Sequence, residues 1–422
     1  MLRAFATAVL LVVAPPAAQN PPPSPKELQA LLEMLIEADR YGAGLSQIDE
    51  AVRALEAIEL TSPAQVKEWS AKLAKLVAKQ PKLEKKSGQH FLWGKGKDKK
   101  GLYLVGGETG RPKALLIAMH GGGQGSGDAW SAQGAFAGAT SKLDWLMVCP
   151  QVLELTEHGW TDSGTEEFVL QLVDAALRTW KIDRDRVYFA GHSMGGYGTW
   201  TLGAHHADRV AALAPSAGAP TPTMGADGKF VDIAPGVIPN LRNVPIVIYQ
   251  SDDDPQVTPE ANRIAAQKLG EAKERWGGFE HEYWEVPGRQ HQEAPGGMPA
   301  LLAKIKDEER NTRPERVVWQ PAVKWKRQFY WLWWSAPSPG SIVVADADKA
   351  ANEVRVTCDV EPRGLEVLLD EALVDLSKEV VVKVNDKEVF RGIPKADLGT
   401  LAKTWLTGDP ELAFAVRVKL TP

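Results

Sequence analysis

The sequence predicts an α/β protein whose central sheet is mostly parallel, and three observations lead to that expectation. Short apolar runs of strand length alternate with helical patterns through the middle of the chain. One of these runs, at 187–190, continues directly into a glycine-containing turn at 191–195 and then into a helical segment. The chain has 422 residues, which exceeds one ordinary hydrophobic core. We therefore expect a parallel sheet covered by helices on both faces, together with further domains.

The first 18 residues are predicted to be a secretory signal peptide. Arg3 supplies a positive charge, residues 5–13 form an apolar segment too short to span a bilayer as a stable helix, and small residues follow up to Ala18. The cleavage position stays open, and an uncleaved anchor is the alternative. Because no later stretch is long enough to cross a membrane, we expect a secreted, periplasmic or cell-envelope protein.

Residues 19–87 are expected to form a helical module. After a proline-rich linker, three amphipathic helices are predicted to begin near Ser24, Ser46 and Ser62, because apolar residues at helical spacing follow each of these capping residues. The lysines of the third helix are interpreted as its solvated face, with contact to an anionic surface as the alternative. The module contains no recognisable catalytic or ligand-binding motif.

Residues 88–311 carry the alternating pattern and are expected to form the central domain. The first two strands are predicted to form an edge hairpin, and the later ones a parallel sheet. The predicted strands are 90–93, 102–105, 114–119, 145–149, 187–190, 210–214, 244–249 and 282–286. The predicted helices are 166–180, 197–202, 261–275 and 299–310. Reactive groups of such sheets gather at the carboxyl ends of the strands.

Residues 312–422 predict an all-β, sandwich-like domain. Short strands separated by turn residues dominate this region, and Asn385-Asp386 is typical of a two-residue hairpin turn. The predicted strands are 316–319, 328–334, 341–345, 353–358, 365–369, 379–384, 387–390 and 413–420. The aromatic run at 329–334 is interpreted as core, and a carbohydrate-stacking platform is the alternative.

Composition and charge narrow the classes of function. The net charge of −5 does not suggest a nucleic-acid partner. The two cysteines, Cys149 and Cys358, lie in separate apolar runs and are expected to be buried, although export makes a disulfide possible. The glycine run after the strand at 114–119 lacks the Gly-Lys-Ser/Thr ending of a phosphate-binding loop. We expect no cofactor and no metal.

Ser193 is the candidate nucleophile. It lies at the centre of a Gly-His-Ser-Met-Gly turn between a strand and a helix, which is the context of a nucleophile elbow. Gly191 and Gly195 provide the absence of side chains that such a strained turn requires, and Gly196 lets the helix pack close to the sheet. The alternative is a glycine-rich turn with an incidental serine.

A serine nucleophile needs a base and an acid that orients the base. His291 follows the last predicted strand on a loop that can reach back over the sheet, and it completes the order Ser, Asp, His along the chain. The acid is expected in the loop after the strand at 244–249, where Asp252, Asp253 and Asp254 are adjacent. The choice among them stays open, and a calcium-binding or solvent-facing loop is the alternative.

Backbone N–H groups are predicted to stabilise an oxyanion beside Ser193. The glycines Gly122 and Gly123 follow the strand at 114–119, where they let the main chain turn its N–H groups inward, and Met194 directly follows the nucleophile.

Three stretches in order carry a family resemblance. These are MHGGGQGSGDAW at 119–130, KIDRDRVYFAGHSMGGYGTW at 181–200 and VPGRQH at 286–291. Residues 88–309 resemble the α/β-hydrolase superfamily, in the secreted branch of feruloyl esterases, polyhydroxybutyrate depolymerase-type enzymes and prolyl oligopeptidase-like enzymes. The family's Asp-Pro-x-Val-x-Pro pattern maps onto residues 254–259 and so implies Asp254 as the acid. The glycine that the family carries shortly before this aspartate is missing, which leaves Asp252 and Asp253 open.

The resemblance implies a serine hydrolase acting on a small-molecule or polysaccharide-linked ester. Trp130, Trp160 and Arg289 lie in loops beside the motifs and are candidate substrate contacts, although each is more readily a packing residue. A peptidase is the alternative within enzymes, because the same groups cleave amides. A non-catalytic polysaccharide-binding protein of the cell envelope is the alternative outside them.

Overall fold

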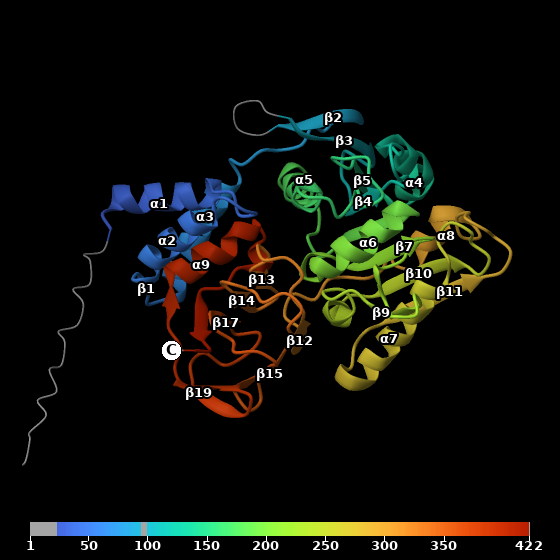
Figure 1. Cartoon of the computed structure of the whole chain (residues 1–422). Coiled ribbons are helices and arrows are strands. Elements are labelled where there is room, and N and C mark those ends of the chain that lie inside the picture. The colour runs from blue at the N-terminus through green and yellow to red at the C-terminus, as the bar shows by residue number, and fades with distance from the viewer. Residues whose placement is uncertain (1–22, 94–98, 422) are drawn as a thin grey trace, which may run out of the picture.

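The computed structural model describes residues 23–93 and 99–421 of the chain. The predicted signal peptide at 1–18 lies outside these residues. One half of the molecule is a sheet flanked by helices, and the other half combines the N-terminal helices with the C-terminal strands (Figure 1). No helix within the described residues is both long and apolar enough to cross a bilayer.

The central sheet has eight strands in the order β11-β10-β7-β6-β4-β5-β3-β2. The six strands from β11 to β5 run parallel, whereas β3 is antiparallel to β5 and β2 is antiparallel to β3. This confirms the predicted edge hairpin and parallel sheet. The strands are β2 (Gly88–Trp93), β3 (Lys99–Gly107), β4 (Ala114–Met119), β5 (Trp145–Pro150), β6 (Val187–His192), β7 (Ala212–Ser216), β10 (Ile246–Ser251) and β11 (His281–Val286).

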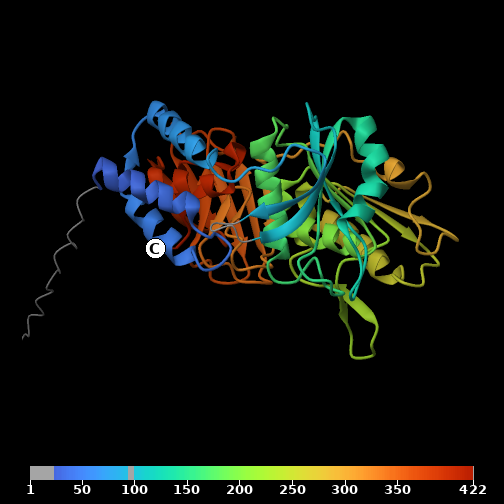
Figure 2. The ribbon, with the colours of Figure 1, turned by 90° about the horizontal axis from the view of Figure 1, so that it is seen from above.

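Helices cover both faces of this sheet. One face packs against α4 (Ala129–Leu143) and α8 (Gly297–Ala303), and the other against α5 (Thr165–Thr179), α6 (Met194–His205) and α7 (Glu260–Trp276). Successive residues of β4 enter the two cores alternately, as the two-residue period of a strand requires. Viewed from above, the helices lie on either side of the sheet (Figure 2).

Two helices of the central domain differ from the expectation. Helix α4 was not among the predicted elements, because its small residues give no clear apolar stripe. The helix predicted at 299–310 ends at Ala303, and Arg310 instead bonds to Asp185 and Asp409, which draws this stretch away from the helix axis.

The N-terminal helices and the C-terminal region share one hydrophobic core. Apolar residues of α1 (Pro25–Glu37), α2 (Leu45–Glu56) and α3 (Pro63–Val77) pack around α9 (Leu398–Thr404), a helix that the sequence analysis missed. The short strand β1 (Glu59–Leu60) pairs with a strand near the C-terminus. Figure 1 shows α9 among the three N-terminal helices. The domain limits stay a prediction, but the helical module is built together with the β region.

The C-terminal region contains two sheets, as predicted. One has the strand order β1-β20-β21-β17-β14-β13, and the other β12-β15-β16-β18-β19. Neighbours run antiparallel except β16 and β18, which are parallel. The strands are β12 (Arg316–Trp319), β13 (Gln328–Phe329), β14 (Leu332–Trp334), β15 (Val343–Asp348), β16 (Glu353–Cys358), β17 (Leu365–Leu369), β18 (Val380–Val384), β19 (Lys387–Gly392), β20 (Ala396–Asp397) and β21 (Val416–Lys419).

Local geometry in this region matches most of the sequence pattern. Asn385 and Asp386 both have positive φ, of 46° and 64°, as a two-residue hairpin turn requires. The strand predicted at 328–334 is broken in two by Tyr330, whose φ is 50°. All six residues of the aromatic run at 329–334 are buried, which confirms the core interpretation. Cys149 and Cys358 are buried free thiols.

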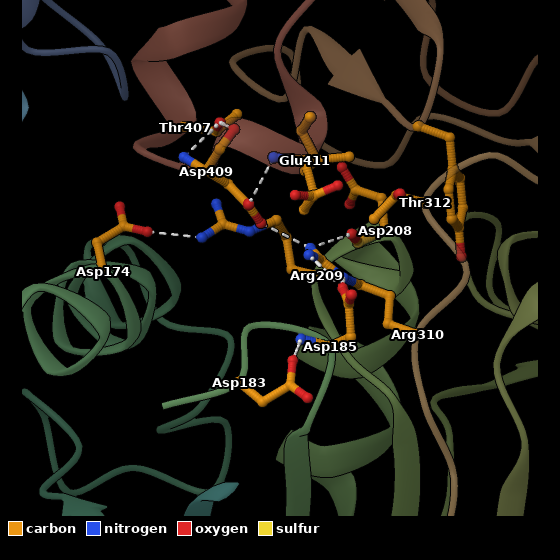
Figure 3. Close-up of polar contacts among 12 residues, drawn as sticks. Asp174, Asp183, Asp185, Asp208, Arg209, Arg310, Thr312, Thr407, Asp409 and Glu411 are labelled. Atoms are coloured by element: carbon orange, nitrogen blue, oxygen red, sulfur yellow. Dashed lines mark hydrogen bonds and ion pairs between the residues drawn. The ribbon is translucent and has the colours of Figure 1, made fainter. Parts of the chain in front are cut away.

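Buried ion pairs join the two halves (Figure 3). The Arg310 side chain is 1% exposed and donates to Asp185 at 2.8 and 2.9 Å and to Asp409 at 2.8 Å. Asp185 precedes β6 of the central domain, whereas Asp409 follows α9. Nearby, Arg209 donates to Asp174 at 2.6 Å. Arg310 therefore links the end of the central domain both to its own sheet and to the C-terminal region.

A buried histidine–glutamate pair lies at the same junction. Nε2 of His206 is 2.6 Å from Oε1 of Glu166, and its ring stacks on Trp325 at 5.6 Å. Burial lowers the pKa of His206 to about 4. Burial acts to raise the pKa of Glu166, but His205 and His206 outweigh it and hold that pKa below its usual range. The structure thus keeps His206 neutral and Glu166 ionised near neutral pH.

Acidification is expected to destabilise the protein through this pair. Below pH ~6.5 the unfolded chain protonates His206 while the folded chain does not until about pH 4, so the free energy of unfolding falls as the pH drops through this window. His206 contributes at most ~3 kcal/mol to that fall. The His206→Gln variant keeps a donor for Glu166 but does not titrate. Its melting temperature between pH 7 and 4.5 should fall less steeply than that of the wild type, and parallel curves would contradict the assignment.

Candidate active site

Ser193 occupies a strained turn between β6 and α6. Its φ of 59° and ψ of −124° lie outside the regions that residues with a side chain normally adopt. A Cβ atom at Gly191 would lie 2.3 Å from the Gly195 carbonyl oxygen, and one at Gly195 would lie 2.1 Å from the Met119 carbonyl oxygen. This confirms the prediction that both positions require glycine, because a side chain at either one would clash with a backbone carbonyl group.

The structure brings Ser193, His291 and Asp254 into one hydrogen-bonded line. Nε2 of His291 is 2.8 Å from Oγ of Ser193, and its Nδ1 is 2.7 Å from Oδ2 of Asp254. The Asp254 side chain is fully buried, and its second oxygen accepts the N–H groups of Gln256 and Val257 at 2.9 and 3.0 Å. A carboxylate held in this way fixes the imidazole with Nε2 toward the serine.

The other two aspartates of this loop have different partners. Oδ1 of Asp252 accepts the N–H of Gly288 at 3.1 Å, and Oδ1 of Asp253 accepts the N–H of Gln290 at 2.7 Å. Within the described residues, no cluster of three His, Cys, Asp or Glu side chains could hold a metal ion. Of the three aspartates that the sequence left open, Asp254 is the one that contacts the imidazole.

His192 lies beside the imidazole of His291. The two ring centroids are 5.1 Å apart, and Nδ1 of His192 is 2.9 Å from Oγ of Ser216 at the end of β7. Burial, followed by the nearby charge of His291, lowers the pKa of His192 to about 4. His192 is therefore neutral near pH 7 and adds no second positive charge beside His291.

The three expected oxyanion donors differ in whether their N–H groups already have a partner. The N–H of Met194 is in the first turn of α6, where N–H groups have no partner within the helix. Gly122 has a φ of 146°, which a residue with a side chain rarely adopts. Gly123, by contrast, donates its N–H to the Ser126 carbonyl at 3.3 Å. The role of Met194 and Gly122 as oxyanion donors stays a prediction, whereas the Gly123 N–H is already engaged.

His120 and Trp160 pack against the glycine loop, residues 121–123. Both side chains are buried, and Nε1 of Trp160 donates to the His120 carbonyl at 3.1 Å. The His120 ring contacts the Gly121 carbonyl through Nδ1 and accepts the Val152 N–H through Nε2. Burial lowers the pKa of His120. At 1% exposure, Trp160 supports the loop, and its position does not support the expected contact with substrate.

The other candidate substrate contacts lie nearer to solvent. Trp130, near the start of α4, is 52% exposed. The Arg289 guanidinium donates to the Glu293 carbonyl at 3.0 Å, and its backbone N–H donates to Ser251. Contact of Trp130 or Arg289 with a substrate stays a prediction.

A hairpin beside the site was missed by the sequence analysis. It consists of β8 (Pro222–Met224) and β9 (Phe230–Ile233) and projects from the domain (Figure 2). Phe230 packs in a small cluster with Tyr197 of α6, while Met224 is 53% exposed. Two short strands that bury little apolar surface give no usable periodicity in the sequence.

Two cavities of the structure lie away from Ser193. One is lined by residues such as Tyr41, His206 and Trp325, and the other by residues such as Trp93 and Arg178. Both lie where the N-terminal helices meet the central domain, and none of the residues of the Ser193–His291–Asp254 line borders them. These two cavities are therefore separate from the Ser193–His291–Asp254 line.

The parallel sheet, the strained turn after β6 and the order Ser, Asp, His are features of the α/β-hydrolase fold. No protein-family model matches the sequence, and no curated protein sequence does either. Among solved structures, the chain is similar to a thermostable esterase with 19% identity and a TM-score of 0.41, over 53% of this chain and 63% of that protein.

Two further solved structures are similar at the same level. A ferulic acid esterase from Anaeromyces mucronatus shares 16% identity with a TM-score of 0.38, over 53% of this chain and 90% of that one. A phospholipase/carboxylesterase from Dyadobacter fermentans shares 18% identity with a TM-score of 0.35, over 48% of this chain and 95% of that one.

Proposed function

We propose that this chain is a serine hydrolase that cleaves carboxylic esters through an acyl-enzyme intermediate. The observation that carries the proposal is the continuous line from Ser193 Oγ through His291 to Asp254, with distances of 2.8 and 2.7 Å. A serine, an imidazole and a buried carboxylate in this order are the parts of a nucleophile and its general base.

The proposed reaction has two stages. Ser193 Oγ attacks the ester carbonyl carbon while Nε2 of His291 takes the hydroxyl proton, and the carbonyl oxygen becomes an oxyanion facing the N–H groups of Met194 and Gly122. The C–O bond to the alcohol then breaks, and His291 returns the proton to the departing oxygen. In the second stage, water attacks the acyl-serine, His291 takes the water proton and passes it to Ser193 Oγ, and the carboxylic acid leaves.

The environment of the imidazole suits this exchange of protons. Asp254 is buried and compensates the positive charge that His291 acquires in each stage. His192 stays neutral and so does not oppose that charge. His291 itself keeps 13% of its side chain exposed, so a substrate or a water molecule can approach Nε2.

The test compares p-nitrophenyl acyl esters with peptide p-nitroanilides. We expect the wild-type protein to hydrolyse short-chain p-nitrophenyl esters with turnover that saturates, and to cleave the nitroanilides at least ~10²-fold more slowly. Faster cleavage of the nitroanilides would favour the peptidase. Absence of both activities in folded protein would favour the non-catalytic binding protein.

We also propose export of the protein, on the basis of the N-terminal sequence pattern alone. N-terminal sequencing of protein recovered from the cell envelope or the medium should begin near Gln19. An intact Met1 in protein recovered only from the cytoplasm would contradict export.

A further inference from the structure

The loop that carries His291 is bound to the end of β10 by two neighbouring side chains. Oγ of Ser251 accepts the N–H of Arg289 at 2.9 Å, and Oδ1 of Asp253 accepts the N–H of Gln290 at 2.7 Å. The two side chains are joined to each other, because Ser251 Oγ donates to Asp253 Oδ1 at 2.7 Å. We call them the Ser251/Asp253 pair. They hold the two residues that immediately precede His291.

The conformation held by this pair is unfavourable in a free loop. Gln290 has a φ of 49°, in the left-handed region that residues with a Cβ atom rarely adopt. Because Gln290 directly precedes His291, its φ and ψ set the position of the His291 backbone, from which the imidazole extends. The N–H of Gln290 donates to Asp253, so this bond stabilises the backbone conformation of the residue that precedes His291.

The two members of the pair differ in burial. Ser251 is fully buried at the carboxyl end of β10 and is therefore fixed by the sheet. The Asp253 side chain is exposed, and the hydrogen bonds from Ser251 and from the Gln290 N–H hold the pKa of Asp253 below its usual range. An exposed carboxylate contributes little to the core, so these bonds are the visible reason for its orientation.

We propose that the Ser251/Asp253 pair positions the catalytic base, with Asp253 acting as a positioning residue for His291 and not as a member of the catalytic line. This inference rests on the proposed function. Asp254 fixes the ring through Nδ1, while Ser251 and Asp253 fix the main chain that carries the ring. Three consecutive aspartates thus have separate roles, because each contacts a different group of the loop.

The test is the Asp253→Ala variant, assayed with the p-nitrophenyl ester that the wild type hydrolyses. We expect kcat to fall ~10- to 100-fold, because a displacement of a catalytic group by about 1 Å has an effect of this size. KM should stay within about twofold, and the melting temperature should stay close to that of the wild type, because the side chain is exposed.

Two further variants separate positioning from loss of charge. Asp253→Asn keeps an acceptor oxygen for the Gln290 N–H and should recover most of the lost kcat. Asp252→Ala is the matched control, since it removes an exposed carboxylate from the same loop, but one whose bond goes to Gly288, three residues before His291. Its kcat should fall much less than that of Asp253→Ala. Equal losses in Asp252→Ala and Asp253→Ala, or full activity of Asp253→Ala, would overturn the proposal.

A crystal structure of Asp253→Ala gives a readout that does not depend on activity. We expect Gln290 to leave its positive φ and Nε2 of His291 to move away from Ser193 Oγ. An unchanged loop would contradict the proposal. A wild-type protein without ester hydrolysis would instead refute the proposed function, while the structure of the variant would still decide the role of the pair.

Discussion

The Ser193→Ala variant is expected to lose about 10⁶-fold in kcat for every ester that the wild type hydrolyses. The hydroxyl oxygen is the atom that forms the bond to the acyl group, and among the described residues it is the side-chain partner of Nε2 of His291. Kinetic assays with a p-nitrophenyl ester, at matched protein concentration, give the measurement. Because alanine removes a single oxygen atom, the melting temperature should change little, which separates loss of chemistry from loss of fold.

The Asp254→Asn variant extends this prediction along the line. An asparagine keeps the shape of the side chain, but it stabilises the wrong tautomer of the His291 imidazole. A loss of about 10⁴-fold in kcat is therefore expected.

Residual activity of Ser193→Ala within tenfold of the wild type would show that hydrolysis takes place elsewhere on the protein.

The second large effect is expected at Arg310. The Arg310→Ala variant leaves Asp409, whose side chain is 1% exposed, without its partner, and also releases Asp185. Removing one member of a buried ion pair costs about 3–5 kcal/mol, because the remaining charge stays desolvated. Chemical denaturation monitored by circular dichroism should show this loss in the free energy of unfolding.

Arg391→Ala is the matched control for Arg310→Ala. Arg391 also pairs with a carboxylate, Glu388 at 2.6 Å, but its side chain is 53% exposed. Surface pairs of this kind contribute at most about 1 kcal/mol. Equal stability losses in the two variants would contradict the view that burial makes the Arg310 bonds important.

Several strands of the fold could be predicted closely, because a fully buried strand is a continuous apolar run and a half-buried strand alternates apolar with polar residues. The predicted boundaries of β4, β12, β16 and β17 agree with the structure. Helix α4 could not be found in the same way, since the residues that it buries are mostly alanines and only Phe136 is a large apolar side chain. The shared core of α1–α3 and α9 joins segments more than 300 residues apart, which no local pattern reveals.

The site was predictable where chemistry dictates residue type and order. The elbow around Ser193 and the position of His291 followed from motifs, because the strained turn excludes side chains at Gly191 and Gly195. The choice of Asp254 depends on which carboxylate of a three-residue run points at the ring, and that is a property of the folded loop.

The contacts around the Ser193–His291–Asp254 line could be found only from the folded structure. Neither the engagement of the Gly123 N–H by Ser126 nor the burial of Trp160 beneath the glycine loop has a local signature in the sequence. The role of Ser251 depends on the register between β10 and β11, which brings its hydroxyl to the backbone of the following loop.

The most direct test of the central claim is covalent labelling with a fluorophosphonate, followed by mass spectrometry of the peptides. The phosphorus should bond to Ser193 Oγ with loss of fluoride, so that the adduct appears on the peptide spanning the elbow and is absent from Ser193→Ala. An adduct on another residue, or no adduct on correctly folded wild-type protein, would contradict the assignment of Ser193 as a nucleophile activated by His291.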